Sequence, residues 1–230
     1  MDKKNFHKGH RERVKERFLR GGLDNFEDHQ VLELLLFYCY PRRDTNEIAH
    51  KMLDEFGTLC TLMEADPLEI AQRCKVTKNV AVLVALTPFL AQRYFIGKWG
   101  KKEVIDSSKK AGLYATALFT GVTIECFYLI CLNARQQLIY PAKISKGTLG
   151  EAPAYPRAVI GEALKHQASS VILAHNHPSG AATPSRSDIE STKRLIAALE
   201  TIDVDVMDHI IVAGDQYFSF SERKTLPLWY

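Results

Sequence analysis

The sequence lacks the features that mark membrane proteins and secreted proteins. No apolar run approaches the ~18–20 residues that a membrane span needs, and the longest, residues 80–90, is flanked by Lys78 and Gln92. The first residues are basic and contain no apolar stretch of a secretory signal. The five cysteines include no C-x-x-C pair, which argues against a disulfide framework and a thiolate zinc site. We therefore expect a cytoplasmic protein with free thiols and no membrane association.

Neither sign of charge dominates the chain as a whole. The 230 residues contain 30 Lys+Arg and 27 Asp+Glu, and the hydrophobic share of 46% is ordinary for a globular protein. Positive charge is concentrated in residues 1–20, which hold eight Lys or Arg and three acidic residues. Such a segment is typical of a nucleic-acid-binding arm, but equally of a solvated helix face in which Glu12 and Glu16 are in register with Arg17 and Arg20. Both interpretations stay open.

Repeats and low-complexity tracts are also absent, and the first half of the chain carries helix signals only. Residues 44–47 form a D-x-x-E capping box, and a long apolar helix is predicted over residues 77–95, with a kink at Pro88. The segment that follows is rich in glycine, lysine and serine, which predicts a linker. The sequence therefore predicts an all-helical domain over residues 1–97 and a linker over residues 98–110.

The second half of the chain alternates between strand and helix patterns. Residues 123–133 form a nearly continuous apolar run rich in aromatic and β-branched residues, which is typical of a buried strand. Further strands are predicted over residues 137–145, 170–175, 204–213 and 217–220, and helices over residues 109–119, 155–167 and 185–202. This order predicts an α/β sandwich with a mixed sheet over residues 111–230.

Two histidines, His175 and His177, stand two residues apart at the end of a predicted buried strand. Side chains at i and i+2 of an extended segment point to one side, so both imidazoles can reach one metal ion. Ser185 fits the N-cap of the next helix, which places Asp188 on the first turn of that helix, facing the strand end. Two histidines and one carboxylate leave a fourth tetrahedral position open, as in catalytic zinc sites. The pattern therefore predicts Zn²⁺ as the cofactor.

A zinc hydrolase also needs a general base, and Glu125 is the candidate. It is the only acidic residue in an apolar run, where an ionised carboxylate costs several kcal/mol unless it is paired or used. The competing interpretation is a glutamate at the entrance of a strand that reaches solvent. His209, next to Asp208 in another apolar strand, either supports a metal ligand or forms a buried pair with its neighbour.

The pattern H-x-H-P-x6-S-x-x-D, with an upstream glutamate, resembles the signature of the JAMM (MPN+) metalloprotease superfamily. The surrounding sequence resembles the bacterial RadC branch, formerly labelled DNA repair proteins, in residues 9–13, 26–29, 144–149, 175–180 and 208–211. The resemblance implies a helix-hairpin-helix-like N-terminal domain followed by a JAMM/MPN-type α/β sandwich. It also implies zinc on His175, His177 and Asp188, with Glu125 as the base that activates water and Ser185 as a donor to the oxyanion.

Two segments depart from the pattern of the RadC branch. Tyr155 stands where that pattern usually has a histidine before Pro-Arg. The hairpin of helix-hairpin-helix domains normally reads Gly-hydrophobic-Gly, whereas the corresponding segment here is Lys75-Val76-Thr77-Lys78. Glycine lets backbone N–H groups approach phosphate, so we expect at best weak DNA binding through the N-terminal domain.

Together the motifs predict a zinc-dependent hydrolase that cleaves a peptide or isopeptide bond in a peptide or protein substrate. The alternative is a nucleic-acid-associated accessory protein of DNA repair or recombination, in which the metal site is structural or silent. The two hypotheses differ in whether Glu125→Gln abolishes hydrolysis while the metal is retained.

Overall fold

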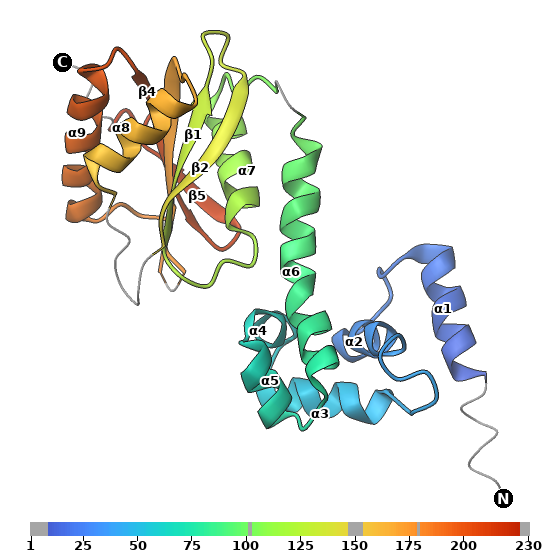
Figure 1. The fold of residues 1–230 in the computed structure, drawn as a ribbon. Helices are drawn as coiled ribbons and strands as arrows, with labels where there is room; N and C mark the ends of the chain where they lie inside the picture. The colour runs from blue at the N-terminus through green and yellow to red at the C-terminus, as the bar shows by residue number, and fades with distance from the viewer. Residues whose placement is uncertain (1–8, 101–102, 147–153, 179, 226–230) are drawn as a thin grey trace, which may run out of the picture. The chain divides into compact units, whose positions relative to one another are not determined.

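The computed structural model describes residues 9–100, 103–146, 154–178 and 180–225 (Figure 1). The chain divides into two compact units, Met1–Leu90 and Ala91–Tyr230. The division falls inside helix α6, Lys78–Lys98. The sequence predicts the domain boundary at residue 97, which lies in the last turn of the same helix. Each unit has a hydrophobic core of its own and is described by itself.

The first unit is helical, as the sequence predicts. Its elements are α1 His10–Gly21, α2 Asp28–Leu36, α3 Asn46–Phe56, α4 Leu59–Glu64, α5 Pro67–Arg73 and the first part of α6. Apolar side chains from α2 to α6 form the core, which includes Leu32, Leu36, Met52, Leu62, Ile70 and Val84. Each such side chain stabilises the fold by about 1.5–3 kcal/mol relative to an exposed one.

Two local features of the first unit bear on the sequence predictions: the start of α3 and the backbone of the hairpin between α5 and α6. The D-x-x-E capping box is wrong, because Thr45 is the N-cap of α3 and Asp44 instead accepts a hydrogen bond from the N–H of Asn46 (3.0 Å). In the α5–α6 hairpin, where the resemblance leads one to expect glycine, Lys75 has φ 53°. This is the left-handed region that favours glycine, so the hairpin backbone takes a glycine-like conformation with a lysine.

Helix α6 is long and apolar, and Pro88 lies in its interior. Its length and mean hydropathy of 1.5 would allow a membrane span, and 22% of that apolar window is buried in the structure. Length and composition are weak evidence for a span, because helices that pack in soluble proteins share both. Among the other described helices the longest, α9, has 15 residues, which is shorter than a membrane span requires.

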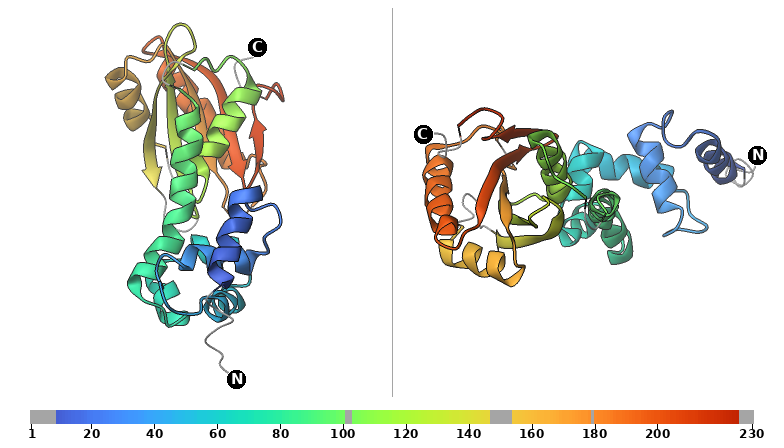
Figure 2. Two further views of the ribbon diagram at one scale, coloured as in Figure 1. Left: turned by 90° about the vertical axis from the view of Figure 1, so that its right-hand side faces the viewer. Right: turned by 90° about the horizontal axis from the view of Figure 1, so that it is seen from above.

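The second unit is an α/β sandwich built on a five-stranded mixed sheet. Its elements are α7 Ser108–Phe119, β1 Cys126–Leu132, β2 Leu138–Lys146, α8 Pro156–Lys165, β3 Ser170–Asn176, α9 Arg186–Glu200, β4 Asp205–Ala213 and β5 Gln216–Ser219. The strand order is β2-β1-β3-β4-β5, in which β3 and β4 are parallel and the other neighbours antiparallel. Helix α7 covers one face of the sheet, and α8 and α9 cover the other (Figure 2). The predicted fold class is confirmed.

Two segments of the second unit differ from the sequence prediction. Strand β1 begins at Cys126 rather than at residue 123, so Glu125 lies just before it. The described residues of the predicted linker, 98–110, all fall within this unit, where Val104 forms an antiparallel bridge with Gln137 and Ile105 is buried. Trp99 also interrupts this largely polar segment, and Trp99 and Ile105 both pack in the hydrophobic core of the second unit.

Helix α7 approaches the sheet closely at one point. Gly112 lies against the ring of Tyr217 on β5, and a Cβ atom at position 112 would overlap three carbons of that ring. On the same helix, Tyr114 and Leu118 are buried in a cluster with Ile130 of β1. The missing side chain at position 112 therefore lets the helix pack directly on the edge of the sheet.

Candidate metal centre

Strand β3 carries the histidine pair at its end. It lies between β1 and β4, and all seven of its residues are buried. His175 is the next-to-last residue of the strand, and the backbone N–H of His177, just beyond it, donates to the carbonyl of Val212 on β4 (2.8 Å). The extended backbone therefore turns both imidazoles to one side, as their spacing predicts.

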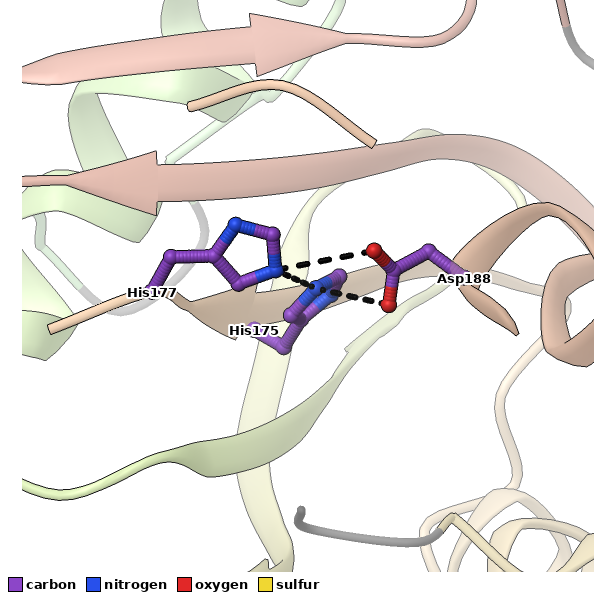
Figure 3. Close-up of side chains that lie close together, drawn as sticks. All are labelled: His175, His177 and Asp188. Carbon is purple, nitrogen blue, oxygen red and sulfur yellow. Dashed lines mark hydrogen bonds and ion pairs between the residues drawn. The ribbon is translucent and has the colours of Figure 1, made fainter. Parts of the chain in front are cut away.

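Asp188 reaches the same point from the first turn of α9. Ser185 is the N-cap of this helix, and its hydroxyl oxygen accepts from the N–H of Asp188 (3.1 Å) while Asp188 Oδ2 accepts from the N–H of Ser185 (2.7 Å). This reciprocal capping box holds the aspartate toward the end of β3. Asp188 Oδ1 lies 3.2 Å from His175 Nε2, and Asp188 Oδ2 lies 3.5 Å from His177 Nε2 (Figure 3).

The ligand atoms of His175, His177 and Asp188 all lie within 4.8 Å of one another and could hold a metal ion. The other nitrogen of each ring is already engaged: His177 Nδ1 donates to the carbonyl of Ala181 (3.0 Å), and His175 Nδ1 bonds to His209 Nε2 (2.8 Å). Both Nε2 atoms, 3.0 Å apart, therefore have lone pairs available for a metal ion. Two imidazole nitrogens and a carboxylate oxygen form a donor set that suits a transition metal.

A chain of buried hydrogen bonds sets the orientation of His175. Thr192 on α9 donates its hydroxyl hydrogen to the carbonyl of Asp188 (2.6 Å), so its oxygen is left to accept from His209 Nδ1 (2.6 Å). His209 Nε2 then accepts from His175 Nδ1 (2.8 Å), which leaves His175 Nε2 for a metal. His209 therefore orients the ring of His175, a candidate metal ligand, which is consistent with one of the two roles left open by the sequence. Sequence reasoning missed Thr192, although its spacing of four from Asp188 places both residues on one face of α9.

The electrostatics of the site keep Asp188 ionised. Partial burial raises the pKa of Asp188, but hydrogen bonds from Ser185 and from the Nε2–H groups of His175 and His177, whose protons a metal ion would displace, outweigh it and hold that pKa well below its usual range. The pKa of His177 is raised in turn, chiefly by its hydrogen bond to Asp188. Burial, and then the nearby charge of His175, lowers the pKa of His209 well below its usual value. His209 is therefore neutral and able to accept a hydrogen bond.

The two remaining predicted site residues lie at the edge of this cluster. Glu125 is half-buried just before β1, and its negative charge contributes to the raised pKa of His177. The expectation of a carboxylate within a buried strand is wrong, but its charge is near enough to act on His177. Ser185 is exposed, and its hydroxyl hydrogen points to Asp188 Oδ2 (2.7 Å). Donation to an oxyanion would require this hydroxyl to turn away from Asp188.

Comparison with known proteins identifies the family of the chain. Residues 105–225 match the model of the RadC-like JAB domain. The chain is similar to UPF0758 protein FN0909 of Fusobacterium nucleatum subsp. nucleatum, at 36% identity over 222 residues, which covers 94% of this chain and 96% of the relative. Both findings agree with the resemblance carried by the motifs. The chain belongs to the RadC family, whose members carry a RadC-like JAB domain.

Proposed function

We propose that this protein is a zinc-dependent hydrolase that cleaves a peptide or isopeptide bond. The observation that carries the proposal is the convergence of His175 Nε2, His177 Nε2 and the Asp188 carboxylate, with each ring held by its other nitrogen. Catalytic zinc sites typically have three protein ligands and an open fourth position, whereas structural sites have four protein ligands. Membership of a JAB family, a group associated with metallopeptidases, supports the same chemistry.

The chain's own residues supply the proton transfers of the proposed reaction. Zinc, when bound, would act as a Lewis acid toward water and the scissile carbonyl. Glu125 accepts a proton from the attacking water and returns it to the leaving amine. Ser185 donates a hydrogen bond to the oxyanion once its hydroxyl has turned from Asp188. His209 takes no part in proton transfer but keeps the ring of His175 in place.

Elemental analysis of purified variants tests the ligand assignment. We expect about one zinc per wild-type chain, and loss of this zinc in His175→Ala and Asp188→Ala. His166→Ala is the matched control, because this histidine also pairs with a carboxylate, that of Glu162 (3.2 Å), but at the C-cap of α8. Equal zinc content in all of these proteins would refute the assignment.

Glu125→Gln tests the base. The variant keeps the size of the side chain but cannot take up a proton, so hydrolysis should fall by ~10²–10⁴ while zinc stays bound. Cleavage is measured by mass spectrometry on a proteome-derived peptide library and on a lysine-linked isopeptide. Activity within a few-fold of wild type would mean that Glu125 is not the base. Loss of zinc would make Glu125 a ligand instead.

DNA binding by the helical unit stays a prediction of the sequence, as does an accessory role in DNA repair or recombination. The hairpin between α5 and α6 has a glycine-like backbone at Lys75, but a lysine side chain projects from it. We therefore propose hydrolysis, rather than nucleic-acid binding, as the function of this chain. The cytoplasmic compartment likewise stays a prediction.

A further inference from the structure

Asn176 stands between the two histidines of the metal site, but alternation along β3 directs its side chain to the other face of the sheet. The residue is 3% exposed. Its Oδ1 accepts a hydrogen bond from the N–H of Cys126 (2.8 Å), and its Nδ2 donates to the carbonyls of Ile124 (3.0 Å) and Val122 (3.4 Å). One side chain thus satisfies three backbone groups at the entrance to β1.

Two of these three hydrogen bonds bracket Glu125. The carbonyl of Ile124 belongs to the peptide group before Glu125, and the N–H of Cys126 belongs to the peptide group after it. Holding both peptide planes restricts φ and ψ of Glu125, and therefore the direction in which its side chain leaves the backbone. The described pairing of β1 with β3 begins at Phe127, which lies opposite His175. For Cys126, the residue before Phe127, the side chain of Asn176 replaces the backbone of β3 as the hydrogen-bond acceptor.

We propose that Asn176 is a positioning residue that aims Glu125 at the metal ligands. This inference rests on the proposed function, in which Glu125 is the general base. The short segment of β3 that presents His175 and His177 then also holds the backbone of the base, so ligands and base are fixed by the same element. A misplacement of about 1 Å in such a group can cost roughly 10²-fold in rate.

Two substitutions at Asn176 remove the proposed restraint in different ways. Asn176→Ala removes all three hydrogen bonds, whereas Asn176→Asp keeps an acceptor for Cys126 and places a carboxylate oxygen against two carbonyls. We expect each to lower kcat for peptide cleavage by about 10–100-fold, with KM and zinc content close to wild type. Loss of zinc would overturn the proposal, because Asn176 would then support the ligands. If the alanine variant fails to fold, the same measurements are made on the aspartate variant.

A double variant separates positioning from a general structural role. If Asn176 acts through Glu125, then adding Asn176→Ala to Glu125→Gln should lower activity by less than about two-fold more. A purely structural role would lower activity by the same factor in both backgrounds and would overturn the proposal. Asn133→Ala is the matched control at the other end of β1, where Asn133 Oδ1 accepts from the N–H groups of Arg135 (2.9 Å) and Gln137 (3.0 Å). Its activity should stay within a few-fold of wild type.

Amide hydrogen exchange provides a readout that needs no hydrolysis. We expect the Cys126 amide, followed by NMR, to exchange at least about tenfold faster in Asn176→Ala, and at the wild-type rate in Asn133→Ala. Unchanged exchange would overturn the proposal whatever the activity, and so would faster exchange with normal cleavage. If the wild-type protein bound zinc but cleaved neither substrate, the proposed function itself would fail, and this proposal with it.

Discussion

The five cysteine side chains range from exposed to fully buried, and their chemistry should differ accordingly. Cys126 and Cys131 are buried in β1 and belong to clusters on opposite faces of the sheet, as their odd spacing predicts. Burial raises the pKa of the Cys131 thiol to about 12. Cys60, on α4, is exposed. Because the thiolate is the reactive form, these environments should give very different reactivities.

We expect iodoacetamide to alkylate Cys60 in the folded protein at pH 8 and to spare Cys131. A thiol with a pKa of about 12 is present as thiolate in only roughly one molecule in 10,000 at that pH. Timed labelling followed by peptide mass spectrometry measures the two rates, and labelling in urea, where both thiols are accessible, is the control. Equal rates in the folded protein would contradict the burial of Cys131.

At the scale of the element, α9 is joined by a hydrogen bond, as well as by its apolar face, to β4, the neighbour of the strand that carries the candidate histidine ligands. The hydroxyl of Thr192 links the carbonyl of Asp188 to His209 on β4. Thr192→Val keeps the shape of the side chain but removes both hydrogen bonds, and an unsatisfied buried donor costs about 1–3 kcal/mol. We expect zinc affinity to fall by about 10–100-fold, the usual scale for residues that support a metal ligand.

Thr201→Val is the matched control for this prediction. Thr201 is an exposed threonine at the C-cap of the same helix, and its hydroxyl donates to the carbonyl of Ala198 (2.6 Å). Competition with a chromophoric chelator measures the zinc affinity of both variants. If the two variants bind zinc equally well, Thr192 has no part in the metal site.

Sequence patterns predict most of these elements but not the contacts that join them. Alternation and the H-x-H-P spacing depend on residues within one or two elements, so they predicted the strands and the grouping of His175, His177 and Asp188. The contacts of His209 could not be predicted, because they join β3, β4 and α9 across the fold. The start of β1 was misplaced because the apolar run, which indicates burial, extends beyond the residues that pair with β3.

At the scale of the whole chain, the two units have separate hydrophobic cores. Met52 belongs to the cluster of the first unit, whereas Leu129 and Ile130 belong to clusters on the two faces of the sheet in the second. Helix α6 runs through the division between the units. Parts of a chain with separate cores can unfold in separate steps, and a single free energy of unfolding then does not describe them.

Met52→Ala should destabilise the first unit by about 2–5 kcal/mol, the usual cost of truncating a buried methionine, without changing zinc content. Neither tryptophan lies within residues 1–90, and Trp99 packs on Tyr114 of the second unit, so tryptophan fluorescence follows that unit while far-UV circular dichroism follows both. In urea we expect the dichroism transition to shift and the fluorescence midpoint to stay. Leu129→Ala is the counterpart and should move the fluorescence midpoint. Equal shifts of both signals in Met52→Ala would show that the units unfold as one.

The close approach of α7 to β5 limits how this sequence can evolve. A side chain at position 112 would overlap the ring of Tyr217, and a smaller residue at position 217 would leave a cavity beside a bare stretch of helix. Neither substitution is neutral alone, whereas the two together can restore packing. A lineage that leaves the Gly112–Tyr217 combination by single substitutions is therefore expected to pass through a less stable intermediate. Across descendants of this sequence, the two positions are expected to change as a pair.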